Sequence, residues 1–239
     1  MVTAEKNNIE PAGQQLIYNK TMCGAYFVEN NQGMQKLTEA LGVSELESRG
    51  IRVPASMVQI VTEPEINQRR LEEAKWWLLL DKNGQPNYQY ATFNSRSDKL
   101  YSSRLTKGLF KNSRCLLPAT GVIEGQNKQY HSLTSSQGAV ALGGLYKRYQ
   151  IGEQQLTTTS VITCPPNRKL DGIHEKSTPL MLDWQDQDLI NMWLDPSLTD
   201  SEAFRHLLTG ELMTPITATP IEGARDLSER GQSVNLSAD

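Results

Sequence analysis

The segment RCLLPATGVIE (residues 114–124) predicts a β-strand that is interrupted at Pro118. It opens a series of apolar and β-branched stretches separated by turn-forming residues. Three more strands are expected in this series, at 129–134, 139–146 and 156–164. Short strands with turn signals between them are typical of an antiparallel sheet. We therefore expect a curled or barrel-like, mostly antiparallel sheet.

Helix-forming patterns lie on both sides of this strand-rich region. Residues 31–48 carry apolar side chains at roughly helical spacing, and a capping box at Thr199–Glu202 begins another helix that ends near Gly210. Further strands are expected at 57–61, 74–80 and 215–219. This order of elements predicts a single α+β domain, with helices flanking the sheet, that spans residues 22–239.

The first 21 residues are polar and show no pattern. They are interpreted as a disordered tail or as upstream sequence wrongly included in the reading frame. They contain no apolar segment of the kind found in secretory signals, and the chain has no apolar run of 18 residues. We therefore expect a cytoplasmic, monomeric protein without a membrane span.

Charge is distributed unevenly along the chain. Residues 67–114 hold ten basic and four acidic residues, a net +6, so the rest of a chain of net charge −3 carries −9. Such asymmetry favours one basic face for a polyanion, and a solvated surface of mixed charge is the alternative. Arg96 and Arg104 lie in this segment and are candidate DNA contacts.

Cys23 follows Met22 directly, so it can become an N-terminal residue if the chain starts or is cut at this point. A terminal cysteine carries an amine beside its thiol. The amine attacks an aldehyde, and the thiol then closes a five-membered thiazolidine ring. The alternative is a buried, small apolar residue near the start of a strand. The three cysteines are odd in number and lack CxxC spacing, which favours neither a disulfide framework nor a metal site.

Three other side chains suit the same reaction. A partly desolvated glutamate such as Glu124 can donate the proton needed for loss of water, and His174 can move protons at neutral pH. Asn94 can hold the amine or a sugar oxygen, and Arg96 can bind a phosphate. Taken singly, each has a plainer interpretation: a turn former, a surface charge, a strand-end carboxylate or a core histidine.

Five short motifs occur in the same order as in a known family, and together they resemble the SOS response-associated peptidase (SRAP) family. They are Met22-Cys23-Gly24, Phe93-Asn94-Ser95-Arg96, the segment 114–124, Gly144-Leu145-Tyr146, and Ile173-His174 with Pro179-Leu180. The resemblance runs from Met22 to about Leu182 and more weakly to the end.

The resemblance implies a barrel-like sheet with flanking helices and covalent trapping of abasic sites in single-stranded DNA. Cys23 would be the nucleophile, with Asn94, Glu124 and His174 as its partners and Arg96 on a DNA phosphate. No metal or organic cofactor is implied.

Several positions depart from the family pattern. Ala25 stands where an arginine is expected, Gly125 where a tryptophan is expected, and Val122-Ile123 replaces an aromatic pair. Position 98 is aspartate where glutamate is common, and Leu78–Gly84 replaces an aromatic-rich loop.

Two other functions remain open from the sequence. One is a cysteine-dependent peptidase that uses Cys23, Glu124 and His174 and acts at its own Met22–Cys23 bond. The other is a divergent DNA-binding module without catalysis.

Overall fold

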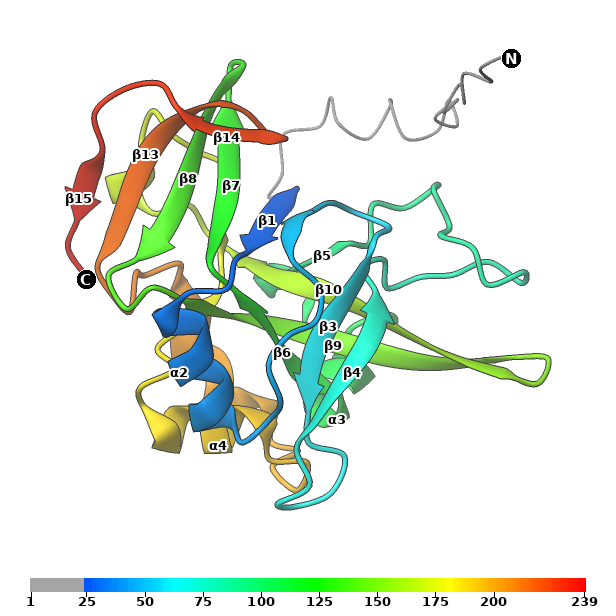
Figure 1. The fold of residues 1–239 in the computed structure, drawn as a ribbon. Coiled ribbons are helices and arrows are strands. Elements are labelled where there is room, and N and C mark those ends of the chain that lie inside the picture. The colour runs from blue at the N-terminus through cyan, green and yellow to red at the C-terminus, as the bar shows by residue number, and fades with distance from the viewer. Residues whose placement is uncertain (1–23) are drawn as a thin grey trace, which may run out of the picture.

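The computed structural model describes residues 24–239. The interpretation of residues 1–21 as a tail therefore lies outside the described residues. Two curved sheets dominate the structure, and helices lie at one end of them (Figure 1). The expected α+β class and the curled, mostly antiparallel sheet are confirmed.

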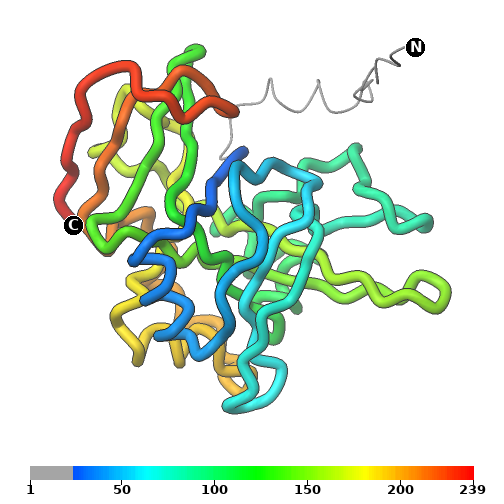
Figure 2. Tube along the Cα trace, in the orientation of Figure 1, coloured from blue at the N-terminus to red at the C-terminus, as the bar shows by residue number. Residues whose placement is uncertain are grey.

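The larger sheet contains a closed five-stranded barrel. Its strands pair in the cyclic order β10-β4-β3-β6-β9, and β9 returns to β10 over eight residue pairs. Shorter strands extend it: β5 (Asn94–Arg96) and β11 (Thr178–Pro179) pair with β10, and β12 (Met181–Leu182) pairs with β9. The β9–β10 hairpin projects from the body as a long arm (Figure 2). The barrel strands are β3 (Met57–Thr62), β4 (Arg70–Lys75), β6 (Arg114–Ala119), β9 (Val140–Ile151) and β10 (Gln154–Cys164).

The smaller sheet is antiparallel and runs in the order β14-β13-β8-β7-β1-β2, with β15 paired to the free side of β13. This sheet contains both β1, the first described strand, and β13 to β15, the last strands of the chain. Tertiary folding therefore brings together strands that are far apart in the sequence. Its strands are β1 (Ala25–Val28), β2 (Gly50–Arg52), β7 (Gly121–Gln126), β8 (Gln129–Ser135), β13 (Ile216–Gly223), β14 (Asp226–Glu229) and β15 (Val234–Leu236).

The chain crosses from the barrel to the smaller sheet at Thr120. The prediction that Pro118 interrupts this strand was wrong, because Pro118 pairs with Ala141 inside β6. The Thr120 amide instead donates to Phe27 O at 2.8 Å, and its hydroxyl accepts the amide of Glu29 at 2.8 Å. The crossing is thus held by β1.

A two-residue turn sets the register of β7 against β8. Asn127 and Lys128 have φ values of 53° and 65°, the left-handed pair that two-residue hairpins of type I′ require. Gln126 therefore pairs with Gln129, and Glu124 pairs with His131.

Helices α2 (Gln32–Leu41), α3 (Lys107–Asn112) and α4 (Gln187–Leu194) each pack against β6. The predicted helix 31–48 was too long, because Gly42 ends α2 in a left-handed conformation and its amide caps Glu39 O. Within residues 24–239 there are also three 3₁₀ helices: η1 (Ser97–Lys99), η2 (Arg168–Leu170) and η3 (Ser201–Thr209). Asp200, inside the predicted capping box, accepts the Glu202 amide and begins η3, which ends at Gly210.

The predicted strand 74–80 was largely wrong. β4 ends at Lys75, and the following tryptophans are core side chains with no exposed surface. Trp76 Nε1 donates to Phe93 O at 2.8 Å, so this tryptophan anchors the chain just before β5. The apolar run is therefore explained by burial rather than by strand pairing.

Gly121→Ala tests the crossing between the sheets. A Cβ at Gly121 would lie 2.6 Å from Leu133 O and 2.9 Å from the Phe27 ring. We expect the free energy of unfolding to fall by about 1–3 kcal/mol, as for overpacked cores, measured by denaturant unfolding. Gly108→Ala is the control: it has open space in α3 and should leave stability unchanged or raise it. Equal stability of the two variants would contradict the close contact.

Candidate active site

Glu124 lies on the inner face of β7. Side chains alternate between the faces of a strand, so Glu124 shares its face with Val122, which belongs to the main core. Ile123 points the other way, into a small outer cluster. The glutamate is only 1% exposed, so the strand places an ionisable carboxyl inside the protein.

His174 reaches the same place from the loop between η2 and β11. It too is 1% exposed, and its Nδ1 lies 3.4 Å from Glu124 Oε2 and 3.2 Å from Gly125 O. The loop is tied to β7 by a further bond, from the Glu175 amide to Gln126 Oε1 at 3.0 Å. The structure thus brings two of the predicted site residues together as a buried carboxyl–imidazole pair.

The start of β1 lies beside this pair. Ala25 pairs with Ile123 in the antiparallel register, and the same register continued by one residue sets Gly24 opposite Glu124. The residue before Gly24 in the chain is Cys23, which lies outside the described residues. Ala25 itself is buried in the small outer cluster with Phe27 and Ile123. A phosphate contact is therefore not made from position 25.

Asn94 and Arg96 occupy one face of the three-residue strand β5, because residues two apart share a face. Asn94 is buried, at 8% exposure, whereas Arg96 is exposed. β5 is tied towards β1 by aromatic contacts: Trp76 bonds to Phe93 O and its ring lies 5.1 Å from that of Tyr26. The strand therefore carries one buried amide and one surface cation.

Arg96 is engaged by a neighbouring carboxylate. Its Nε and NH2 atoms donate to Asp98 at 2.9 and 2.8 Å, and both side chains are at least half exposed. The hydrogen bonds from Arg96 lower the pKa of Asp98. An incoming phosphate would compete with this carboxylate for the guanidinium. Arg104 is exposed between η1 and α3, where it faces solvent.

Arg114 is a structural residue rather than part of a basic face. It is 5% exposed, and burial lowers its pKa to about 10. Its guanidinium donates to backbone carbonyls and lies over the Phe204 ring, 4.4 Å from the centroid. The accepting carbonyls belong to Phe110, Lys111, Trp193, Asp195 and Leu198. The expectation that the whole segment 67–114 is one basic face therefore needs correction at Arg114.

The two described cysteines are core residues. Cys115 and Cys164 are buried and free, and burial raises the pKa of each thiol to about 12. A thiol with so high a pKa is a poor nucleophile at neutral pH. Among residues 24–239, no group of three or more His, Cys, Asp or Glu could hold a metal ion.

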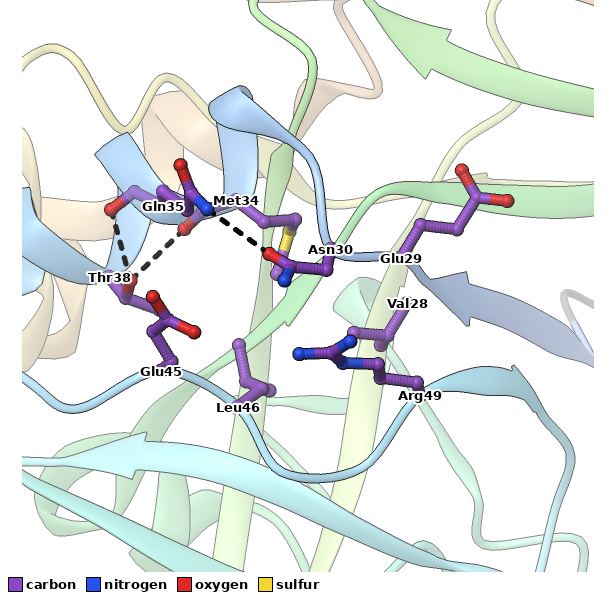
Figure 3. Close-up of a pocket in the computed structure, with 9 residues that line it drawn as sticks. All are labelled: Val28, Glu29, Asn30, Met34, Gln35, Thr38, Glu45, Leu46 and Arg49. Atoms are coloured by element: carbon purple, nitrogen blue, oxygen red, sulfur yellow. Dashed lines mark hydrogen bonds between the residues drawn. The ribbon is translucent and has the colours of Figure 1, made fainter.

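Two hollows have been located on the described surface, and neither is lined by the Glu124–His174 pair. One, between β1, α2 and the segment 45–49, has a cavity volume of about 20 Å³ and holds one water at most (Figure 3). The other, of about 580 Å³, is an open groove between the end of α2, the loop 63–69 and α4. In the part of the chain described, no helix is long and apolar enough to cross a membrane.

No motif in the sequence marks His131, which the structure sets directly opposite Glu124. The signal that could have revealed it is the hairpin register. A two-residue turn at Asn127-Lys128 pairs each residue of β7 with one fixed residue of β8.

The fold and the site define a class: an α+β protein whose barrel and second sheet enclose a buried glutamate–histidine pair next to its first strand. The chain belongs to the SOS response associated peptidase (SRAP) family, whose model matches residues 22–224. The resemblance in the five motifs is thereby confirmed.

Curated relatives and solved structures agree with this assignment. Abasic site processing proteins YoqW and YobE of Bacillus subtilis are 24% and 23% identical to this chain over 149 residues, 59% of its length. The match covers 65% and 66% of those relatives, just under two thirds.

The solved structures share the fold. A protein from Bacteroides thetaiotaomicron has a TM-score of 0.65 at 18% identity, covering 83% of this chain and 92% of that one. A protein from Bordetella bronchiseptica has a TM-score of 0.62 at 16% identity, covering 91% and 99%.

Proposed function

We propose that this protein traps abasic sites in single-stranded DNA by a thiazolidine link to Cys23, once residues 1–22 are absent. Family membership and the names of the curated relatives support processing of abasic sites. One observation carries the finer proposal. The buried Glu124–His174 pair stands where β1 begins, and Cys23 is the residue that precedes β1 and Gly24 in the chain.

The reaction balances as follows. The amine of Cys23 attacks the aldehyde carbon of the ring-opened abasic sugar and gives a carbinolamine. A proton from Glu124 lets the hydroxyl leave as water, which forms an iminium ion. The thiol sulfur then adds to the same carbon, its proton passes to the Glu124 carboxylate, and the ring closes. One molecule of water is released for each crosslink.

His174 holds Glu124 in place for this proton transfer. Its Nδ1 faces both the carboxylate and the carbonyl of Gly125. Its Nε2 is buried and has no hydrogen-bond partner within residues 24–239, so it is open to a substrate oxygen. Assistance with opening of the sugar ring is the role we assign to it.

We assign DNA binding to two exposed arginines, Arg96 and Arg104. Arg96 shares a strand face with Asn94, which supports a phosphate contact by Arg96 beside the buried amide. Arg104 is also exposed and follows Arg96 by eight residues, so we assign it a second phosphate contact along the DNA strand. Contacts between arginine side chains and DNA phosphates release counterions, so the binding affinity should fall as the salt concentration rises.

Two variants test the chemistry on an oligonucleotide with one abasic site. Cys23→Ala should abolish the crosslink on denaturing gels, because both the thiol and its ring closure are lost. Glu124→Gln keeps the shape but cannot supply the carboxylic proton, so the crosslinking rate should fall by about 100-fold or more.

The matched control is Cys115→Ala, which removes a buried thiol and should leave the crosslink intact. Unfolding curves establish that each variant is folded. A crosslink retained by Cys23→Ala would remove Cys23 from the mechanism. An unchanged rate for Glu124→Gln would reduce Glu124 to a structural residue.

Asp98→Asn tests the role of Arg96. Removing the competing carboxylate frees the guanidinium for phosphate, so non-covalent affinity for single-stranded DNA should rise about two- to fivefold at low salt. Fluorescence anisotropy measures this affinity. Glu202→Gln frees Arg205 from a similar exposed pair on η3 and serves as the control. Equal gains in both variants would show a general charge effect rather than a contact by Arg96.

The second candidate is self-cleavage at the Met22–Cys23 bond. It is favoured by the family's description as a peptidase and by a family match that begins at residue 22. Intact mass and N-terminal sequencing of protein purified from its own cells show whether Cys23 is the N-terminal residue, which either self-cleavage or a translation start at Met22 would produce. We expect Cys23 at the N-terminus. A chain that retains residues 1–22 would leave Cys23 without a free amine and would contradict the crosslinking mechanism.

A further inference from the structure

A second histidine lies on the other flank of Glu124. His131 is its direct partner in the β7–β8 register. Opposed residues of an antiparallel pair project from the same face, with Cβ atoms about 4.5–5.5 Å apart. The neighbouring pair Val122–Leu133 lies on this face as well, and both side chains belong to the main core. His131 therefore points inward, beside Glu124.

The two histidines differ in burial. His174 is 1% exposed and contacts Glu124 directly, whereas His131 is only half-buried. Nδ1 of His131 is nevertheless buried and has no hydrogen-bond partner anywhere in residues 24–239. Burial lowers the pKa of His131, which favours its neutral form. A neutral imidazole has one N–H donor and one acceptor nitrogen, so it can take a proton on one side and release one on the other.

His131 is half-buried whereas Glu124 is 1% exposed, so a route from the carboxyl to solvent can pass through this histidine. On β13 its opposite residue is Pro220, which cannot titrate, and Glu222 follows on the same face. Along β7, the loop that carries His174 also brings Glu175 and Lys176 to this end of the sheet. Of the titratable side chains named here, only Glu124 is directly opposed to His131.

The proposed reaction must release a proton. An α-amine has a pKa of about 7.7–8.0, so it enters the reaction mostly as an ammonium ion at neutral pH. Ammonium, thiol and aldehyde together give thiazolidine, one water and one proton. Glu124 gives one proton to the leaving hydroxyl and takes up the two that the ammonium and the thiol shed, so it must pass one on, but at 1% exposure it is cut off from bulk solvent.

We propose that His131 relays the released proton from Glu124 to solvent through one bridging water, an inference that rests on the proposed function. The ring accepts a proton at Nδ1 and gives one up at Nε2, and no other reactant is consumed. His131 acts through Glu124 and not on the DNA, so it is a positioning residue for the proton of that carboxyl.

The test is chemical rescue of crosslinking. His131→Ala should slow crosslinking at pH 7 by about tenfold, less than the loss of a direct acid–base group. Added imidazole should restore the rate in proportion to its neutral form, because it can fill the space of the lost ring. His131→Gln keeps the bulk and hydrogen bonding of the side chain but cannot relay, so it should remain slow and folded. His206→Ala, which removes an exposed histidine on η3, is the matched control and should match the unmodified protein.

Each outcome decides the inference. Normal rates in His131→Ala and His131→Gln would overturn it while leaving the proposed function standing. Slow variants that imidazole does not rescue would show a structural role and would also overturn it. Rescue that persists in the Glu124→Gln background would mean that the relay does not act through Glu124. Absence of any crosslink by the unmodified protein with Cys23 at its N-terminus would overturn the proposed function, and the relay with it.

Discussion

The crossing of the chain from the barrel into the second sheet is the constraint on which the site depends. β6 and β7 are separated by a single residue, Thr120, and the backbone there is held by hydrogen bonds to β1. Gly121 packs against the Leu133 carbonyl with no room for a side chain. Because the crossing is this short, the phase of β7 is set by the barrel. That phase turns Glu124 inward and Ile123 outward, so a shift of one residue would remove the carboxyl from the site.

Burial sets the conditions for proton transfer at the glutamate–histidine pair. A carboxyl and an imidazole at 1% exposure lie 3.4 Å apart, held from two different parts of the chain. Water is largely excluded at this point, so proton transfers depend on the few polar groups that reach it. The smaller sheet supplies both flanks: β1 brings the chain that follows Cys23, and β8 brings His131. The solved structures from Bordetella bronchiseptica and Bacteroides thetaiotaomicron share the fold of this chain.

Where the pattern was local, sequence reasoning succeeded. The strands expected at 57–61, 129–134 and 156–164 lie within β3, β8 and β10, and the one at 139–146 overlaps β9 from Val140 on, because β-branched runs and turn residues are short-range signals. It failed where an apolar run was buried in the core without pairing as a strand, and where a helix cap ended a helix before its apolar spacing ended. Trp76 and Trp77 are apolar because they fill the core, and Gly42 ends α2 although apolar spacing continues beyond it. β2, β5 and β14 are too short to produce a pattern of their own.

By itself, the sequence determined which residue types were available to the site and the order of the strands that carry them. Glu124 and His174 could be named because carboxyl and imidazole groups at strand and loop ends suit proton transfer. Only the tertiary structure decided their pairing, the burial of Arg114 and the place of His131. The physical reason is that side-chain distance across a sheet depends on register and on strand order. Both are set by contacts between residues far apart in the chain.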